Sequence, residues 1–223
     1  MLSNGYRDNR RWFLSKFALG AAAFTAPGVF AEELTRTPRQ GEGPFYPNKL
    51  PLDTDNDLLI INDGLTPAVG EVTHLSGRIL DAKGNPLRNA IVEIWQADNT
   101  GTYIHTGSVD RAKRGERDQN FQGFGRFLTG SSGEYYFRTI KPRPYGPRTA
   151  HVHFAVKKKG MERFTTECYV KGEAKNKTDF VLNRVKDLKA RQSLIVDFAP
   201  VKESRAGELA AKFDVVLGFT PKA

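Results

Sequence analysis

Short runs of apolar and β-branched residues, separated by turn signals, recur along most of the chain. Eight of these runs have the length and residue types of β-strands and cover residues 72–80, 90–96, 124–129, 134–140, 151–156, 164–170, 193–198 and 213–219. Residues 81–86 form a turn after the first run, and residues 130–133 connect the third and fourth runs as a short hairpin loop. The pattern therefore predicts an all-β fold, a β-sandwich of mostly antiparallel strands.

Two other kinds of segment complete the pattern. Residues 179–191 and 205–211 have helical character and predict one or two short helices. Residues 32–70 show little periodicity and contain several prolines and glycines, which predicts an extended N-terminal arm. The sandwich domain would then occupy residues 71–223, a length that one hydrophobic core can serve.

The first 31 residues have the features of an export signal. The pair Arg10 and Arg11 precedes an apolar stretch, residues 17–30, that is too short to span a membrane. The pair resembles the twin-arginine signal of bacteria, which implies export to the periplasm or beyond of a protein already folded, often with its cofactor installed. We expect cleavage after Ala31 and no stable membrane span afterwards. The alternative is an amphipathic first helix of the fold.

Charge and cysteine content narrow the classes of function. The formal net charge is +9, of which +6 remains on residues 32–223, and this surplus favours anionic ligands. The only dense basic run is residues 157–159, which we interpret as a solvated hairpin tip. Nucleic-acid binding needs a clustered basic stripe, so no nucleic-acid partner is predicted. Cys168 is the only cysteine, which excludes an intramolecular disulfide and favours an apolar packing role.

Two histidines at strand spacing are the first candidates for chemistry. His151 and His153 lie two residues apart on a predicted strand, so both imidazoles point to the same face. They are either metal ligands or paired histidines on an exposed face. Tyr145 lies six residues before His151 in a proline-rich loop that stiffens the backbone around it. Arg148 is close enough in sequence to share the same pocket.

Several segments together resemble the intradiol ring-cleavage dioxygenases, the superfamily of the catechol and protocatechuate dioxygenases. The matching segments are residues 40–47, 77–98 with Tyr103, 123–138 and 142–154. Two spaced tyrosines followed by Arg-x-x-His-x-His in the same order are the most specific part. The likeness is to the compact protocatechuate-type subunit, because the helical N-terminal domain of the catechol and hydroxyquinol enzymes is absent from the sequence.

The resemblance implies a non-haem Fe(III) centre. Carried over by position, its ligands would be Tyr103, Tyr145, His151 and His153. Phenolate oxygen is a hard anionic donor that stabilises ferric iron, and a phenol loses its proton when it binds such a cation. The implied reaction uses O₂ to open an aromatic diol between its hydroxyl-bearing carbons, giving a cis,cis-muconate-type diacid. Tyr145 would leave the metal and accept a substrate proton, while Arg148 would stabilise negative charge on the ring.

Further residues are candidates for the substrate pocket. Pro44 and Tyr46, in the aromatic and proline-rich part of the arm, either line the pocket or only pack. Glu167 stands where the family often has a glutamine near the substrate, so the chain would differ there in substrate preference or in the charge tolerated. His105, two residues after Tyr103, is a candidate neighbour of the site. The family often assembles, and a homo-oligomer stays open for this chain.

Two other functions fit parts of the sequence. Residues 77–95 also fit a transthyretin-like β-sandwich module, exported to bind or brace without catalysis. A second alternative keeps a metal but replaces iron by zinc or copper with hydrolase chemistry. Two tyrosine ligands argue against it, since zinc sites draw on Cys, His, Asp and Glu. Colour discriminates, because tyrosinate–Fe(III) would tint the protein red to burgundy and a binding module would be colourless.

Replacing Arg10 and Arg11 by lysine should keep the protein in the cytoplasm without abolishing its activity, because folding precedes twin-arginine transport. Cell fractionation followed by immunodetection and an activity assay measures both quantities. Equal periplasmic levels of the double variant and the parent would contradict the twin-arginine interpretation.

Overall fold

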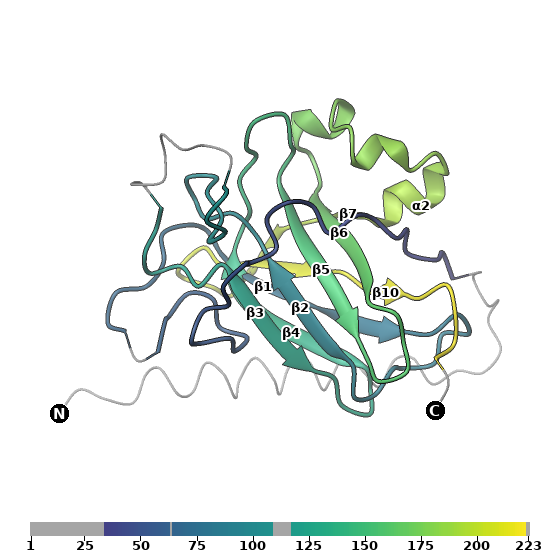
Figure 1. Ribbon diagram of the computed structural model, residues 1–223. Coiled ribbons are helices and arrows are strands. Elements are labelled where there is room, and N and C mark those ends of the chain that lie inside the picture. Colours follow the sequence, from purple (N-terminus) through teal and green to yellow (C-terminus); the bar gives the residue numbers. More distant parts are fainter. Residues whose placement is uncertain (1–33, 63, 109–116, 222–223) are drawn as a thin grey trace. The chain divides into compact units, whose positions relative to one another are not determined.

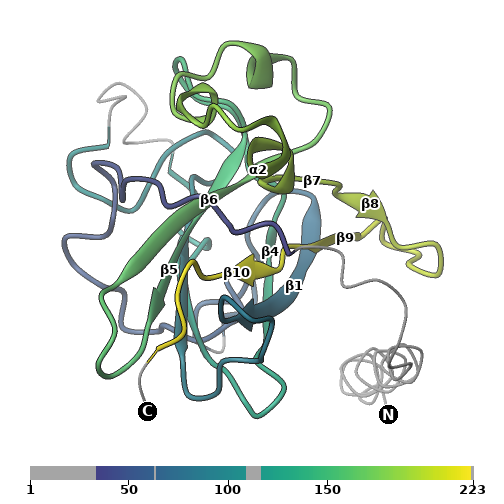
Figure 2. The ribbon, with the colours of Figure 1, turned by 90° about the vertical axis from the view of Figure 1, so that its right-hand side faces the viewer.

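The protein folds into two β-sheets that lie in two layers. The computed structural model describes residues 34–62, 64–108 and 117–221. The two sheets are seen in the ribbon of Figure 1 and, turned by 90°, in Figure 2. The β-sandwich expected from the hydrophobic pattern is confirmed. The expected export signal and its cleavage site, in residues 1–31, lie outside the described residues.

The first sheet is built around β1 (Val72–Leu80). β4 (Glu134–Ile140) pairs with β1 in antiparallel orientation along most of its length. β9 (Leu209–Lys212) and β10 (Val215–Val216) pair with β1 in parallel, and β8 (Ala199–Pro200) is antiparallel to β9. The sheet is therefore mixed, with the C-terminal segment completing it.

The second sheet has the order β3, β2, β5, β6 and β7. These strands are Phe124–Leu128, Ile91–Trp95, His151–Lys157, Phe164–Val170 and Ile195–Val196, respectively. Every neighbouring pair is antiparallel except β6 and β7, which are parallel. β5 is therefore a central strand, with β2 on one side and β6 on the other.

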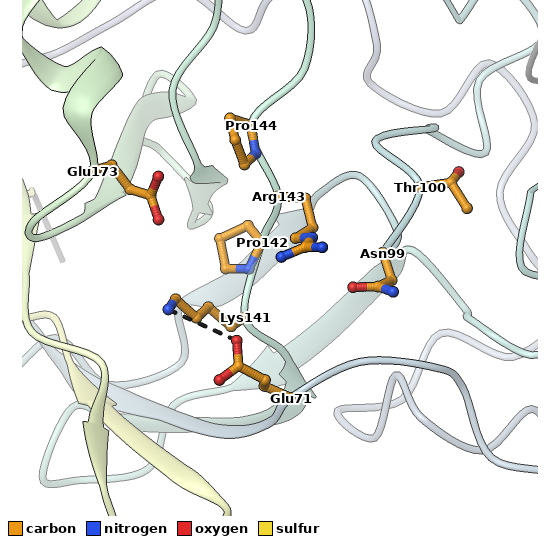
Figure 3. Close-up of a pocket in the computed structure, with 8 residues that line it drawn as sticks. All are labelled: Glu71, Asn99, Thr100, Lys141, Pro142, Arg143, Pro144 and Glu173. Carbon is orange, nitrogen blue, oxygen red and sulfur yellow. Dashed lines mark ion pairs between the residues drawn. The ribbon is translucent and has the colours of Figure 1, made fainter.

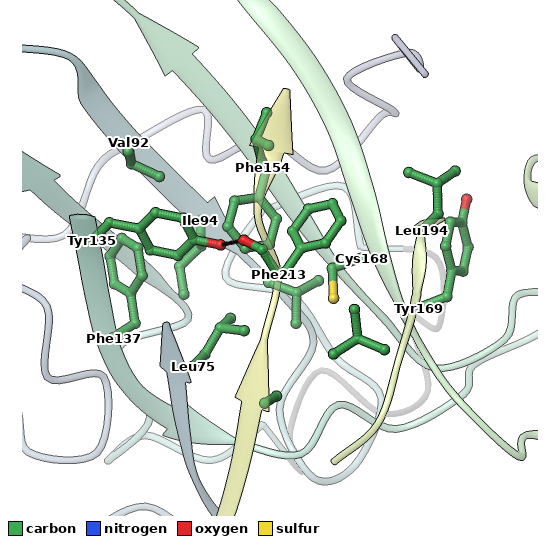
Figure 4. Packing of buried hydrophobic residues seen from close by; sticks show 14 of the residues in the cluster. Leu75, Val92, Ile94, Tyr135, Phe137, Phe154, Cys168, Tyr169, Leu194 and Phe213 are labelled. Carbon is green, nitrogen blue, oxygen red and sulfur yellow. Dashed lines mark hydrogen bonds between the residues drawn. The ribbon is translucent and has the colours of Figure 1, made fainter. Parts of the chain in front are cut away.

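The two sheets bury one apolar core between them. Ile94 of β2 and Phe154 of β5 enter it from the second sheet, and Leu75 of β1 enters it from the first. Figure 4 shows Phe154 beside Phe213 of the C-terminal segment, with ring centroids 5.1 Å apart. Cys168 packs in the same core, and burial raises the pKa of its thiol, so it serves as a small apolar side chain.

The described part of residues 34–70 forms no helix and no strand, but it is built into the fold. Leu58 and Leu59 are core residues with almost no exposed surface. Farther upstream, the arm crosses the second sheet, where the backbone N–H of Gln40 donates to the carbonyl of Thr165 over 2.9 Å. The arm thus covers a face of the sheet that would otherwise meet solvent.

The prediction of a helix over residues 205–211 is wrong. Leu209–Lys212 forms β9, in which Leu209 and Ala211 are buried and alternate with more exposed residues. Alanine and glutamate favour helix locally, but pairing with β1 and burial of alternate side chains override that weak preference.

The predicted helix over residues 179–191 is interrupted. Its region holds a 3₁₀ turn, η4 (Leu182–Arg184), and a short helix, α2 (Leu188–Ser193), after a preceding 3₁₀ turn, η3 (Ala174–Lys177). The carboxylate of Asp187 accepts the backbone N–H of Ala190, so Asp187 caps a new helix where the sequence suggested a continuous one. Among the described residues, no helix has the length and apolar content that crossing a bilayer requires.

Leu75→Ala should lower the free energy of unfolding by about 2–5 kcal/mol, because it leaves a cavity in a fully buried site. Leu128→Ala is the matched control, since Leu128 also lies on a strand but is 63% exposed, and its effect should stay within about 0.5 kcal/mol. Urea denaturation of both variants measures the difference. Equal losses would contradict the assignment of the core.

Candidate metal centre

The face of the second sheet that is turned away from the core carries the candidate chemistry. His151 and His153 alternate with core residues along β5, so both point to this outer face. The strand register places His153 opposite Trp95 of β2 and Glu167 of β6, and it places His151 opposite Tyr169. All five side chains are buried. Strand pairing therefore gathers one patch from three separate parts of the sequence.

Tyr103 reaches this patch from a tight turn after β2. Oδ1 of Asp98 accepts the backbone N–H groups of Thr100 and Thr102, over 2.8 and 3.0 Å. Gly101 closes the turn with a φ of 84°, a value that favours glycine. The chain then directs Tyr103 inward, where its hydroxyl lies 3.3 Å from Nε2 of His151.

Tyr145 reaches the patch from a second tight turn, just before β5. Backbone hydrogen bonds join Tyr145 and Arg148 in both directions, over 3.2 and 2.8 Å, and Gly146 between them has a φ of 46°. The Tyr145 ring is half-buried, with its centroid 5.3 Å from that of Tyr103 and 5.5 Å from that of His151. The structure thus brings together the four predicted ligand side chains.

The surroundings of the two Nδ1 atoms indicate which ring nitrogens are unprotonated, through a hydrogen bond for His151 and through a nearby carboxylate for His153. Nδ1 of His151 lies 2.6 Å from the carbonyl oxygen of Thr149 and therefore carries the proton. Nδ1 of His153 faces Oε1 of Glu167 at 3.4 Å, which favours a proton there as well. The two Nε2 atoms, 3.2 Å apart, then face each other with lone pairs. That contact is unfavourable unless a cation lies between them.

Burial sets the protonation of all four groups. It lowers the pKa of His151, and burial with the neighbouring His151 ring lowers the pKa of His153 well below its ordinary value, so both rings stay neutral. Burial also raises the pKa of Tyr103 and of Tyr145, more strongly for Tyr103, so both phenols keep their protons unless a cation is bound. Neutral imidazoles beside ionisable phenols are a nitrogen and oxygen donor set that fits a metal ion.

Glu167 forms a second candidate set with the histidines. Ligand atoms of His151, His153 and Glu167 all lie within 4.8 Å of one another. However, Glu167 approaches Nδ1 of His153, whereas the atom of that ring that faces His151 is Nε2. Tyr103 lies on the Nε2 side, so we assign Glu167 to the outer side of the His153 ring rather than to the ligands.

Arg148 is held in a buried ionic cluster. Its Nε donates to Oδ2 of Asp179 over 2.9 Å, and its Nη2 donates to Oε2 of Glu167. Burial alone would lower the pKa of the Arg148 guanidinium, but Glu167 and then Asp179 outweigh it and hold the pKa above its ordinary value. Arg148 is therefore a permanently charged part of the site and not a surface ion pair.

The arm presents a different aromatic residue to the tyrosines than the sequence suggested. Pro44 is exposed, and Tyr46 packs edge-on against Trp95 with centroids 5.0 Å apart. Between them, Phe45 is buried and stacks on Tyr103 at 5.1 Å. Its ring centroid is also 6.2 Å from that of Tyr145. Sequence reasoning missed Phe45, although an apolar aromatic between two prolines was a signal for burial.

Tyr46 belongs to a second ionic cluster on the same face. Glu93, fully buried on β2, accepts from Tyr46 over 3.0 Å and from Arg126 over 2.8 Å, and Nζ of Lys157 lies 2.7 Å from it. Burial would raise the pKa of Glu93, but Lys157 and Arg126 outweigh it and lower the pKa. Lys157 therefore pairs with a buried carboxylate, and only the following residues form the solvated hairpin tip.

Two histidines lie outside the patch. His105 packs near Phe45, with ring centroids 5.9 Å apart, and its Nδ1 accepts the backbone N–H of Gly107. His74 lies on β1 of the first sheet, where Nδ1 is 2.6 Å from the hydroxyl of Tyr136. Neither ring contributes to the meeting of the four candidate ligands.

A cavity of about 390 Å³ lies along the loop that precedes Tyr145. Figure 3 shows the residues that line it, namely Glu71, Asn99, Thr100, Lys141, Pro142, Arg143, Pro144 and Glu173. None of the candidate ligands lines this cavity. It lies between the turns that carry the two tyrosines, and its lining is mostly polar, with an ion pair between Lys141 and Glu71.

The sequence is similar to known enzymes over most of its length. A family model described as Dioxygenase matches residues 41–218. The chain is 34% identical to the protocatechuate 3,4-dioxygenase beta chain of Burkholderia cepacia over 175 residues, 75% of this chain and 72% of that protein. It is 33% identical to a catechol 1,2-dioxygenase of Acinetobacter baylyi over 179 residues, 72% of this chain and 53% of that protein. The chain spans about half the length of the catechol and hydroxyquinol dioxygenases that it matches.

Solved structures give a consistent result. The catechol 1,2-dioxygenase from Acinetobacter sp. ADP1 matches with a TM-score of 0.63 at 26% identity, over 96% of this chain and 70% of that one. The dioxygenase domain of a dioxygenase carbohydrate-binding protein fusion from Streptomyces sp. SirexAA-E matches with a TM-score of 0.62 at 26% identity, over 83% of this chain and 99% of that one. Sequence and fold therefore point to the same group of proteins.

His153→Ala should lose most of the bound metal, because it removes one of the two facing imidazoles. His74→Ala is the matched control, since it removes a partly buried histidine from the other sheet and should leave the metal content unchanged. Elemental analysis of purified protein gives metal per chain, and thermal melting checks the fold of both variants. Parental metal content in His153→Ala would contradict the ligand assignment.

Proposed function

We propose a function from one premise: the chain belongs to the intradiol ring-cleavage dioxygenase family, whose members are enzymes. We infer that it is a non-haem Fe(III) dioxygenase that uses O₂ to cleave a catechol-type diol to a cis,cis-muconate-type diacid. The observation that supports this most directly is the meeting of Tyr103, Tyr145, His151 and His153 on the outer face of the second sheet. A non-catalytic β-sandwich module gives these four side chains no reason to meet.

These four residues would hold the iron. When bound, ferric iron would supply a Lewis-acidic, redox-active centre that makes the ring of the diol reactive towards O₂. Tyr103 and Tyr145 would bind as phenolates, whose hard oxygen suits ferric iron better than zinc or copper. His151 and His153 would bind through Nε2, because the Nδ1 atoms face Thr149 and Glu167.

The two tyrosines differ in the freedom that their surroundings allow. Tyr103 is buried and stacked on Phe45, so it would stay in place throughout turnover. Tyr145 is only half-buried and lies on a turn at the edge of the patch. Burial raises the pKa of Tyr145, so its oxygen binds a proton readily once it is away from a cation. Tyr145 is therefore our candidate for the base that accepts a substrate proton.

Arg148 would act electrostatically on the same side of the site. Burial raises the pKa of Tyr145, and the positive charge of Arg148 acts against this rise, since it stabilises the phenolate. Negative charge that develops on the substrate ring would be stabilised in the same way. Glu167 and Asp179 fix the position of the guanidinium, and their two negative charges exceed its single positive charge, so the stabilisation depends on the guanidinium lying nearer the substrate than the carboxylates do.

We further propose a subunit type, a cellular location and an arm residue that borders the site. Similarity to the protocatechuate beta chain supports a compact protocatechuate-type subunit. Arg10 and Arg11 support export to the periplasm in a bacterium. Pro44 and Tyr46 have little support as substrate contacts, and Phe45 replaces them as the arm residue that borders the tyrosines.

The function is tested by oxygen uptake against a panel of catechols with and without a carboxylate, with the product identified by absorbance and mass spectrometry. Red to burgundy protein that consumes one O₂ per diol and yields a muconate-type diacid would support the proposal. Colourless protein without oxygen uptake after loading with iron would contradict it.

Tyr145→Phe should keep most of its iron and some colour, because three ligands remain, while turnover falls by about 10²-fold or more, the scale for loss of a general base. Tyr136→Phe is the matched control, since Tyr136 lies on β4 of the other sheet. Iron per chain, the visible band and oxygen uptake are measured on each variant. Parental turnover in Tyr145→Phe with full iron would exclude both roles of Tyr145.

A further inference from the structure

Glu167 is a buried carboxylate with two hydrogen bonds to one oxygen and an imidazole beside the other. Its side chain is 1% exposed, a position that an ionised carboxylate occupies only when it is paired and hydrogen-bonded. Oε2 accepts from Nη2 of Arg148 and from the hydroxyl of Tyr169, the latter over 2.6 Å. Oε1 faces Nδ1 of His153 at 3.4 Å. Both oxygens thus point towards protein groups, and the side chain has almost no exposed surface.

The arm holds Glu167 from the other side. The backbone N–H of Glu167 donates to Oε1 of Gln40 over 3.0 Å, and Nε2 of Gln40 donates to the hydroxyl of Tyr169 over 2.9 Å. Gln40, Tyr169 and Glu167 therefore form one connected network. Its effect is to fix the carboxylate between two functional groups, the Arg148 guanidinium and the His153 imidazole.

The His153 ring is packed closely on its faces and edge, and Glu167 is the acidic group that approaches its Nδ1 among the described residues. Trp95 stacks on the imidazole with centroids 4.8 Å apart and planes 3° from parallel. Gly43 lies so close that a side chain there would begin 3.3 Å from Cε1 of His153. In the described part of the chain, no group makes a full hydrogen bond to Nδ1. A shift of about 0.5 Å towards Glu167 would give one of ordinary length, about 2.9 Å.

We propose that Glu167 is a positioning residue of the metal centre, which fixes the orientation of His153 and strengthens its Nε2 as a donor. The inference rests on the proposed function. A carboxylate that accepts the distal N–H of a ligand histidine orients the ring and raises its basicity. A glutamine, which the family often has here, is neutral and would strengthen the donor less. The charge of Glu167 is thus a property that separates this chain from the common pattern.

Glu167→Gln keeps the shape of the side chain and removes its charge. We expect its affinity for iron to fall by about 10–100-fold, the usual cost of losing such an outer partner. The tyrosinate-to-iron absorption band should move to longer wavelength, because a weaker imidazole donor leaves the metal more electron-poor. Iron affinity is measured on the full-length protein by competition with a chelator, and the band by visible spectroscopy in the absence of substrate.

Two carboxamide variants serve as controls. Oδ2 of Asp179 accepts from Nε of Arg148 and from the backbone N–H of Thr149. Asp179→Asn therefore removes the second carboxylate that pairs with Arg148 and should leave the band in place. Glu93→Gln removes a buried carboxylate of the same sheet face that is paired with Lys157 and Arg126, and should also leave it in place. A band shift confined to Glu167→Gln supports the proposal, and equal shifts in all three variants would overturn it.

Two other results are decisive. Iron-loaded Glu167→Gln with the parental band and parental affinity, even if it melts at a lower temperature, would show that Glu167 only stabilises the fold and would overturn this inference alone. Parent protein that takes up no iron and shows no band would overturn the proposed function together with the inference.

Discussion

The alternation of side chains along β5 is the constraint on which the site depends. Val152 and Phe154 are fully buried in the core between the sheets, which fixes the face on which the residues between them must lie. His151 and His153 therefore point to the opposite face, and a shift of register by one residue would bury them in the apolar core instead. Stability of the sandwich and geometry of the site are in this way set by the same strand.

The outer face could not work as an open sheet surface. The arm and the two tyrosine turns cover the imidazoles of His151 and His153 and the phenol of Tyr103, so these three polar groups are buried. Phe45 supplies the apolar cover over Tyr103, and Gln40 supplies the hydrogen bonds that attach the arm to β6. The arm is thus part of the site, although it has no regular secondary structure.

Most strands and the candidate ligands could be predicted from the sequence, and the reasons are physical. β1, β4 and β6 match their predicted limits, because long runs of buried strand residues leave a clear pattern. Glu167 and Phe45 were harder to place. The partners of Glu167 come from β5, β6 and the arm, and pairing between distant segments leaves no local pattern. The helix predicted over residues 205–211 did not form, because the local helix preference is weak compared with pairing to β1.

The net charge of the buried groups around the site also depends on the carboxylate of Glu167. Arg148, Glu167 and Asp179 together carry one net negative charge in a region with little exposed surface. Ferric iron held by two tyrosinates, as we propose, would carry one net positive charge, so the complete assembly would be neutral. Burying an unbalanced charge costs several kcal/mol even after relaxation. With a neutral amide at position 167 or 179 the cluster would be neutral and the positive charge of the metal centre would stay uncompensated. Charge balance therefore adds to the affinity for the metal through either carboxylate, whereas the effect on the His153 ring belongs to Glu167, the carboxylate that faces Nδ1.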